Sequence, residues 1–256
     1  MNEKALRTLE YHKIIDLLVR HANCDAAKKR CKKLTPMTSL ADIETAQRQT
    51  ADALSRIFKK GSLSFLGVQD VTASMKRLEI GAALSIEELL HLASLLEVAK
   101  RAKAYSRNDR TEEAETSDSL DEFFDGIEPL TPLLEEIRRC IISSDEISDE
   151  ASSGLKAVRR SMKGMQDKIH SQMNSILNSA SASGLLQDNV ITMRNGRYCL
   201  PVKSEYKNQV SGMVHDQSST GSTLFIEPLA VVNLNNELKE LYLKEQEEIE
   251  KILADL

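Results

Sequence analysis

The spacing of apolar residues along this chain predicts a protein built mostly of helices. Over the first 33 residues, leucines and isoleucines recur at helical spacing, and Thr35-Pro36 ends that run. The run Ser85-Ile-Glu-Glu resembles a capping box that opens another apolar helix. Beyond the first run, helical patterns cover residues 40–60, 71–78 and 85–104, with a glycine-bounded loop expected over 61–67.

From residue 155 onward the apolar residues advance regularly by three and four, as in a coiled-coil seam. A second such helix begins near Leu229 and reaches Leu256 without a stop signal, so we expect a fragment cut inside a longer helix. Helices of about 28 residues would each be about 40 Å long. We expect an antiparallel pair, an arm whose tip is residues 186–228. The first seam comprises Leu155, Val158, Met162, Met165, Ile169, Gln172 or Met173, and Ile176.

The stretch VITMRNGRYCLPVK breaks the helical pattern and predicts a tight hairpin. Asn195-Gly196 is a strong signal for a two-residue turn, because both central positions need positive φ. That turn sets Arg194 opposite Arg197, and it pairs 193 with 198, 192 with 199 and 191 with 200. Alternation then predicts an apolar face of residues 191, 193, 198 and 200. Pro201 lacks a ladder donor, so we expect its strand at an edge or at a bulge.

Two further strands are expected at Val210 to Asp216 and Ser222 to Pro228, completing a sheet of about four antiparallel strands. Its apolar face would pack on the end of the arm. The predicted fold is therefore mainly α, with a small antiparallel sheet at the tip of two long antiparallel helices.

Two arginines directly opposite each other repel mildly, and two interpretations stay open. Either the pair holds an anion, phosphate above all, or both side chains are simply solvated at a turn. The residues alone favour the solvated interpretation. The candidate nucleic-acid-binding residues are Arg194, Arg197, Lys203 and Lys207 around the hairpin, and Lys156, Arg159, Arg160 and Lys163 on the first seam helix.

Composition narrows the function classes. The net charge of −5 argues against a protein that coats nucleic acid over its whole surface. Residues 109–150 hold fifteen acids and three arginines, an excess of twelve negative charges, and the polar run RNDRTEEAETSDS predicts a surface loop. No apolar run approaches the roughly 18 residues of a membrane span. Four scattered cysteines favour reduced, buried thiols and a cytoplasmic location: Cys24, Cys31, Cys140 and Cys199.

No catalytic, cofactor or metal site is expected. The histidines are isolated, and Cys24 and Cys31 lack partner ligands at zinc-finger spacing. Neither a phosphate-binding P-loop nor a dinucleotide fingerprint is present. His215-Asp216 beside serines is weak support for a hydrolase, because neighbouring strand residues point to opposite faces. The sequence therefore predicts a piece that is not an enzyme.

The run from Leu186 to Leu253, which includes the hairpin and the stretch VHDQSSTGSTLFIEP, resembles the MutS-type ATPases, and most closely their second bacterial branch (MutS-two). LRTLEYHKIIDLL, LEIGAALSIEELLHLASLL and ISDEASSGLKAVRRSMKGMQDKI resemble the same branch, in the same order. The likeness covers nearly the whole chain except the acidic loop around residues 107–122.

The resemblance implies a helical core domain at 1–145, an ascending lever helix at 146–185, a β-rich clamp at 186–228 and a truncated descending lever at 229–256. It implies phosphate contacts that hold duplex or branched DNA without reading sequence. Full-length members add an ATPase, which binds ATP and Mg²⁺ and makes a homodimer, and usually an Smr endonuclease domain. The family is associated with recombination suppression, a form of DNA repair, and with rescue of collided ribosomes.

Two functions thus remain as hypotheses for this chain. One is a clamp that grips DNA or ribosomal RNA through backbone charge, and the other is an interaction scaffold whose arm contacts protein, a second copy or a ribosomal protein. A steep loss of binding with salt would favour the first, and salt-insensitive self-association the second.

Overall fold

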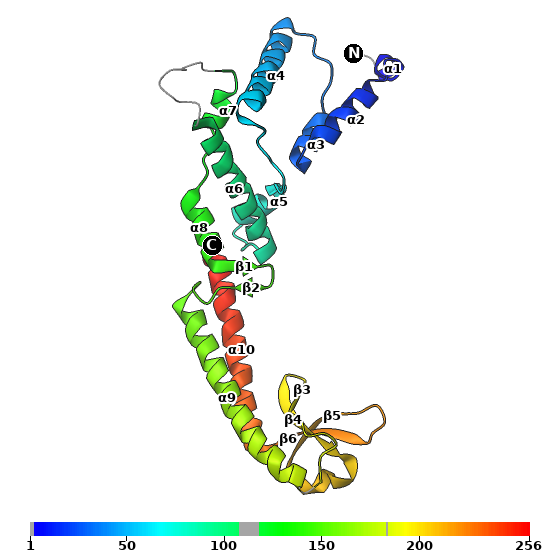
Figure 1. Ribbon diagram of the computed structural model, residues 1–256, viewed down its shortest axis with the longest axis vertical. Coiled ribbons are helices and arrows are strands. Elements are labelled where there is room, and N and C mark those ends of the chain that lie inside the picture. Colours follow the sequence, from blue (N-terminus) through cyan, green and yellow to red (C-terminus); the bar gives the residue numbers. More distant parts are fainter. Residues whose placement is uncertain (1–2, 108–117, 183) are drawn as a thin grey trace. The chain divides into compact units, whose positions relative to one another are not determined.

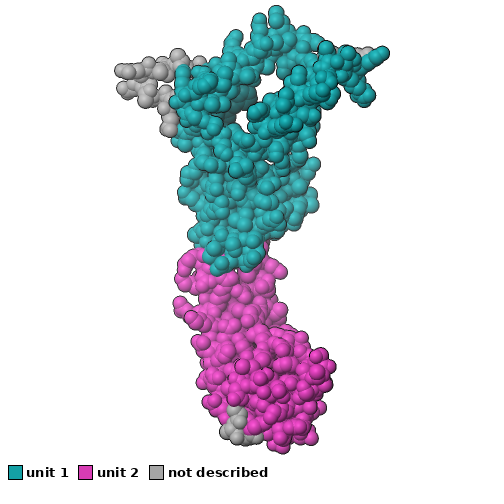
Figure 2. Space-filling view, turned by 45° about the vertical axis from the view of Figure 1, so that its right-hand side comes forward, with its two compact units in different colours: residues 1–146, 256 teal, residues 147–255 magenta. Residues whose placement is uncertain are grey.

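The computed structural model describes residues 3–107, 118–182 and 184–256, without the side chains of 181 and 182. Helices dominate, and the described strands form a four-stranded antiparallel sheet and a two-stranded ribbon. This confirms the mainly helical composition and the small sheet. The chain divides into two compact units, residues 1–146 with 256 (unit 1) and residues 147–255 (unit 2), coloured separately in Figure 2. Most of the loop predicted at RNDRTEEAETSDS lies outside the described residues.

Unit 1 begins with three short helices where the apolar spacing predicted one run. Glu10 has φ of 54°, which no right-handed helix continues through, and Cys24 is extended. The helix predicted over 40–60 is confirmed. The helices of unit 1 are α1 (Glu3–Thr8), α2 (Tyr11–His21), α3 (Asp25–Lys32), α4 (Leu40–Lys60), α5 (Thr72–Glu79), α6 (Ile86–Arg107), α7 (Asp121–Asp125) and α8 (Thr131–Cys140).

The capping box predicted at the start of α6 is present. The Ser85 amide donates to the Glu88 carboxylate over 2.9 Å, and the Glu88 amide donates to the Ser85 hydroxyl over 3.3 Å. From that start, α6 buries Leu89 and Leu96 and packs on α8, which buries Ile137. The hydrophobic core of unit 1 therefore lies mainly between α6 and α8.

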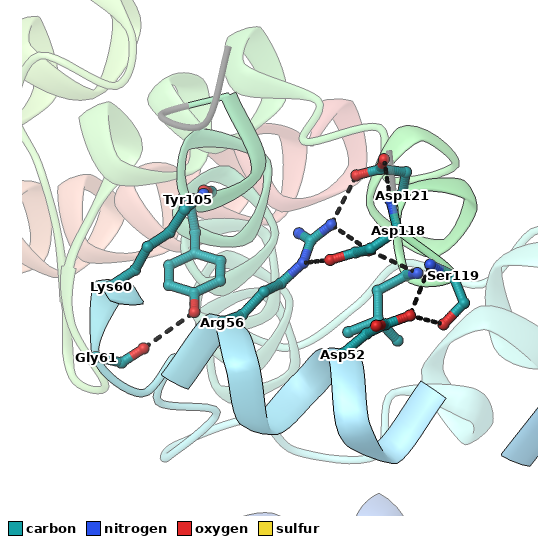
Figure 3. A network of polar contacts seen from close by, with 9 residues as sticks. Asp52, Arg56, Lys60, Gly61, Tyr105, Asp118, Ser119 and Asp121 are labelled. Atoms are coloured by element: carbon teal, nitrogen blue, oxygen red, sulfur yellow. Dashed lines mark hydrogen bonds and ion pairs between the residues drawn. The ribbon is translucent and has the colours of Figure 1, made fainter. Parts of the chain in front are cut away.

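A polar network ties α4 to the segment around α7 (Figure 3). Arg56 is 6% exposed, and its guanidinium donates to both carboxylate oxygens of Asp118 and to Asp121, each over 2.6 Å. The hydroxyl and amide of Ser119 both donate to Asp52, and they hold the pKa of that carboxyl below its usual range. Acids from the strongly acidic stretch therefore serve as partners of α4.

The ribbon β1 (Ile141–Ser143) and β2 (Glu146–Ile147) lies within the acidic stretch, where no strand was predicted. Its strands have three and two residues, too short to show a period in the sequence. Beyond it come α9 (Ser153–Ala182), β3 (Thr192–Arg194), β4 (Arg197–Lys203), a 3₁₀ helix (Ser204–Gln209), β5 (Gly212–Gln217), β6 (Thr223–Pro228) and α10 (Leu229–Asp255).

Helices α9 and α10 lie side by side and antiparallel (Figure 1). Arg159 near the start of α9 bonds Glu245 near the end of α10, whereas Gln166 bonds Tyr242. With 30 and 27 residues, the two helices are about 45 and 40 Å long. The predicted seam faces this contact: its apolar members are buried or pack partly buried against the core, whereas Gln172 is exposed.

The sheet has the order β3-β4-β6-β5 and packs on the later half of α9 and the beginning of α10. Tyr198 of β4 sets its ring edge-on to His170 of α9, with centroids 5.0 Å apart. Leu200 and Ile226, partners across β4 and β6, are at most 1% exposed. One apolar core thus joins both helices and the sheet.

The expectation that Pro201 marks an edge or a bulge is wrong. Strand β4 lies between β3 and β6, and Pro201 pairs with Phe225 in regular register. The carbonyl of Pro201 accepts from the Gln187 amide, so its missing N–H faces the segment beside β4 and not β6. The register shift of this sheet lies in β5, between Val214 and Asp216.

No helix within the described residues is long and apolar enough to cross a membrane. All four cysteines are free thiols, but only Cys140 and Cys199 are buried. Cys24 and Cys31 are partly exposed, because α3 has no buried residue, so the prediction of four buried thiols is wrong for this pair.

Candidate nucleic-acid interface

The hairpin has the predicted turn. Asn195 and Gly196 have φ of 50° and 74°, as a turn with two positive φ values requires. Arg194 pairs with Arg197, and the next two predicted pairs are also present. The turn is tied to β5, because the side-chain Nδ2 of Asn195 donates to the carbonyl of His215 over 3.2 Å. Register and turn place the two arginines together, and their partners differ.

Arg197 forms an ion pair with a carboxylate that is closed off from water. Its Nη1 donates to Oε1 of Glu227 over 2.7 Å, and its Nη2 donates to Asn236 of α10 over 2.6 Å. The Glu227 side chain is 0% exposed and that of Arg197 is 20% exposed. A buried carboxylate needs a cation and hydrogen-bond donors, so Arg197 has a structural partner inside the fold.

Glu227 collects three donors from three elements. Besides Arg197, the amide of Asn235 donates to Oε1 over 2.7 Å, and His215 Nε2 lies 2.5 Å from Oε2. Asn235 also exchanges two longer hydrogen bonds with the backbone of Tyr198. This network (Arg197, His215, Glu227, Asn235 and Asn236) joins β4, β5, β6 and α10.

The face of the hairpin opposite the predicted apolar one, which carries Thr192, Arg194, Arg197 and Cys199, is therefore partly buried. Cys199 lies on that face and is 0% exposed, since the hairpin folds over Glu227. Burial, with the neighbouring Glu227 carboxylate, raises the pKa of the Cys199 thiol to about 11. On the face predicted to be apolar, Tyr198 and Leu200 are buried but Met193 is 45% exposed. The predicted apolar face therefore packs into the core except at Met193, and the opposite face is buried at Cys199 as well.

Arg194 lies over the outer surface of the sheet. Its guanidinium carbon is 4.0 Å from the centroid of the Phe225 ring, and its Nε is 3.3 Å from Oδ2 of Asp216. Nη1 donates to the carbonyl of Met193. The side chains of Arg194 and Asp216 are 38% and 48% exposed, so this pair faces water.

Of the two candidate lysines near the hairpin, Lys203 has a partner within the fold and Lys207 is exposed to solvent. Lys203 donates to the carbonyl of Gly184 over 3.1 Å, and its ammonium lies 5.9 Å from the centroid of the Tyr206 ring. Lys207 is exposed in the 3₁₀ helix and makes no ion pair or hydrogen bond within the part of the chain that the structure describes. Lys207 therefore keeps its charge available to solvent.

The basic stripe on α9 comprises the candidate cations Lys156, Arg159, Arg160 and Lys163. Two of them pair with acids, and the other two keep exposed charge. Arg159 bonds Asp149, Glu245 and the carbonyl of Ile147, and Lys156 pairs with Glu150. Arg160 and Lys163 are exposed, and neither has a polar partner in residues 3–107, 118–182 and 184–256. These two cations are the ones on the stripe that remain free to meet an anion.

The sequence pattern missed the residues that organise this site. Glu227 follows Ile226 in a strand where an alternating pattern would place a solvent-facing acid, and Asn235 lies on the face of α10 that packs inward. A signal for Asn235 is available, since it stands between the seam positions Leu234 and Leu238. None marks Glu227, because its burial depends on how the hairpin folds over β6.

In the described residues, no group of three or more His, Cys, Asp or Glu is placed to hold a metal ion. His215, the residue of the weak hydrolase hypothesis, points its Nε2 at the buried Glu227. The arrangement offers cationic and hydrogen-bonding groups suited to holding an anion.

Comparison with known proteins gives consistent matches along the whole chain, although no family model matches it. It is 58% identical over 256 residues to endonuclease MutS2 of Agathobacter rectalis, 52% to that of Lachnospira eligens and 44% to that of Clostridium acetobutylicum. Each alignment covers 100% of this chain and 32% of the relative, so the chain spans about a third of those proteins.

Proposed function

Because this chain belongs to the MutS2 family, we propose that unit 2 grips nucleic acid through its sugar-phosphate backbone. In this proposal α9 and α10 are the two levers, paired as a coiled coil, and the sheet β3 to β6 is the clamp at their end. Cationic groups would contact phosphates and leave base edges unread. The targets we propose are duplex or branched DNA, in recombination suppression, or ribosomal RNA of collided ribosomes.

One observation carries this proposal: the structure divides the candidate cations into those paired inside the fold and those open to solvent. Arg194, Lys207, Arg160 and Lys163 keep exposed charge, and we assign the phosphate contacts to them. Arg197, Arg159 and Lys203 have partners within the fold that a phosphate would have to displace, and Lys156 forms an exposed pair with Glu150. A chain with net charge −5 would therefore bind through a few local cations.

The larger activity is proposed for the whole protein. We assign the endonuclease activity that the relatives' names carry to the part of their length that this chain does not span. In the full-length protein an ATPase would bind ATP and Mg²⁺, hold two copies together as a homodimer and drive the levers. The grip of unit 2 would then be the DNA- or ribosome-contacting step of that cycle.

A salt titration tests the proposal. The chain is titrated with a labelled four-way DNA junction at increasing salt, with purified ribosomes as competitor. Log affinity falls with log salt, and each phosphate contact adds about 0.9 to the steepness of that fall. Arg160→Glu with Lys163→Glu should therefore make the fall shallower by about two. Lys32→Glu with Lys33→Glu on unit 1 makes the same charge change and should leave the slope nearly unchanged. Binding by the wild type without salt dependence would contradict the proposal.

A scaffold function is the second candidate, and one observation favours it. Helix α2 exposes Ile14, Leu17 and Leu18 to 60%, 55% and 40%, and none of its residues is buried. Exposed apolar residues gathered on one helix are typical of a surface that contacts protein. In that case the chain would bind a second copy or a ribosomal protein, and association would persist at high salt.

A further inference from the structure

The surroundings of Arg194 are built by three strands. Asp216 of β5 and Phe225 of β6 are direct cross-strand partners, so their side chains share one face of the sheet. Arg194 belongs to β3, at the other edge of the sheet, and the hairpin brings it over this pair. Anchors on both sides of the turn hold the hairpin there, through Asn195 to β5 and Arg197 to Glu227.

Part of the guanidinium remains free in this position. An arginine has five N–H donors, of which Nε–H faces Asp216 and one N–H of Nη1 is bonded to Met193. Within the described part of the chain, the Nη2 amino group and the second N–H of Nη1 have no partner. The Phe225 ring covers one side of the guanidinium plane and fixes its orientation.

We propose that Arg194, Phe225 and Asp216 form a receptor for one backbone phosphate, in which Asp216 is the internal anion that the phosphate replaces. This inference rests on the proposed function and adds a ligand group and a means of control to it. In the free protein Asp216 holds the arginine in place on Phe225. In the complex a phosphodiester takes Nε–H from Asp216 together with the exposed Nη2 amino group, and Asp216 turns to solvent.

The exchange is physically easy because both partners face water. An exposed ion pair contributes little to stability, so giving it up costs little. A guanidinium binds phosphate through two parallel N–H···O bonds, which an ammonium cannot make. Because Phe225 already orders the side chain, binding loses little conformational freedom. Asp216 then weakens binding by competing for the arginine, and it keeps weakly held anions out.

Four variants of the 256-residue chain test this with labelled duplex DNA at low salt, followed by fluorescence anisotropy. Asp216→Asn should bind about two- to fivefold tighter, because its competing charge is gone. Arg194→Lys should bind about tenfold more weakly although its charge is kept. Phe225→Leu should bind several-fold more weakly with an unchanged salt slope, because charge is retained and orientation lost. Asp188→Asn, on an exposed acid of unit 2, is the control for removing one negative charge.

The outcomes separate the two proposals. If Asp216→Asn gains no more affinity than Asp188→Asn, or if Arg194→Lys binds like the wild type, the receptor is refuted while the grip of unit 2 stands. If the wild type fails to bind duplex DNA and ribosomes at low salt, the proposed function itself is refuted. Far-UV circular dichroism of each variant shows whether its helices are intact, and a variant that loses them is replaced by Asp216→Ser or Phe225→Met.

Discussion

Replacing Arg197 with methionine should destabilise unit 2, because the buried carboxylate of Glu227 loses its positively charged partner. Methionine keeps much of the length and the apolar stem of arginine, so packing on α10 changes little. The substitution removes the guanidinium that lies 2.7 Å from Oε1 of Glu227, a side chain that is 0% exposed. The carboxylate stays buried without its cation, and Asn236 loses a donor.

The structure sets the size of the effect. Removing one partner of a buried ion pair costs about 3–5 kcal/mol. Arg197 is 20% exposed, and Asn235 and His215 still contact Glu227, so we expect the lower end, about 3 kcal/mol. With a urea dependence of about 2 kcal/mol per molar, the midpoint of unfolding should fall by about 1.5 M.

The measurement is urea unfolding, monitored by the exchange of backbone amides within β6, which reports on unit 2 alone. Arg194→Met is the matched control, on the same hairpin and also paired with a carboxylate. Because the pair of Arg194 with Asp216 is exposed, that variant should lose less than about 1 kcal/mol. Adding Glu227→Gln to Arg197→Met should restore at least about 1 kcal/mol, because it removes the unpaired charge and keeps an acceptor for Asn235.

Equal losses in Arg197→Met and Arg194→Met would refute this reasoning, since burial would then not distinguish the two arginines. A double variant less stable than Arg197→Met alone would refute it as well. Either result would also remove the basis for treating Arg197 as structural and Arg194 as the phosphate ligand. A double charge reversal of both arginines would mix the two effects, because it would place a second carboxylate beside Glu227.

Four smaller effects are expected from single positions. Gly212→Ala should destabilise the pairing of β5 with β6 by more than about 1 kcal/mol, because a Cβ there would overlap the β6 backbone. Gly164→Ala on the open side of α9 should stabilise that helix by about 0.5–1 kcal/mol. Amide exchange measures both effects. Ser85→Ala should cost about 1 kcal/mol and speed exchange in the first turn of α6, and unchanged exchange would contradict the capping role. Burial raises the pKa of the Cys199 thiol to about 11 from 9.0. Because the thiol of the unfolded chain ionises first, the free energy of unfolding should fall as the pH rises from 9 to 11. Cys199→Ala should flatten the decline in urea midpoints measured across that interval.

Features that depend on a few neighbouring residues could be predicted from the sequence. The helix over 40–60, the capping box at Ser85 and the Asn195-Gly196 turn are confirmed, because helical period, cap chemistry and positive φ are local requirements. The turn also fixed the pairing of Arg194 with Arg197. The eight candidate cations and the division into core, levers and clamp stay predictions.

The contacts of the arginines depended on residues far along the chain. Arg197 meets Glu227 thirty residues later and Asn236 thirty-nine residues later, and neither distance leaves a periodic signal. Strand β4 is central because β6 returns beside it, which a proline in the strand argued against. Alternation assigns side chains to two faces but does not say which face another element covers.

The sequence by itself determined the longer helices, the turn that faces two arginines and the family resemblance. Only the tertiary structure decided that one arginine pairs with a buried carboxylate and the other lies on an aromatic ring in reach of solvent. The physical reason is that local sequence sets backbone conformation, whereas the environment of a charge is set by every element that folds around it.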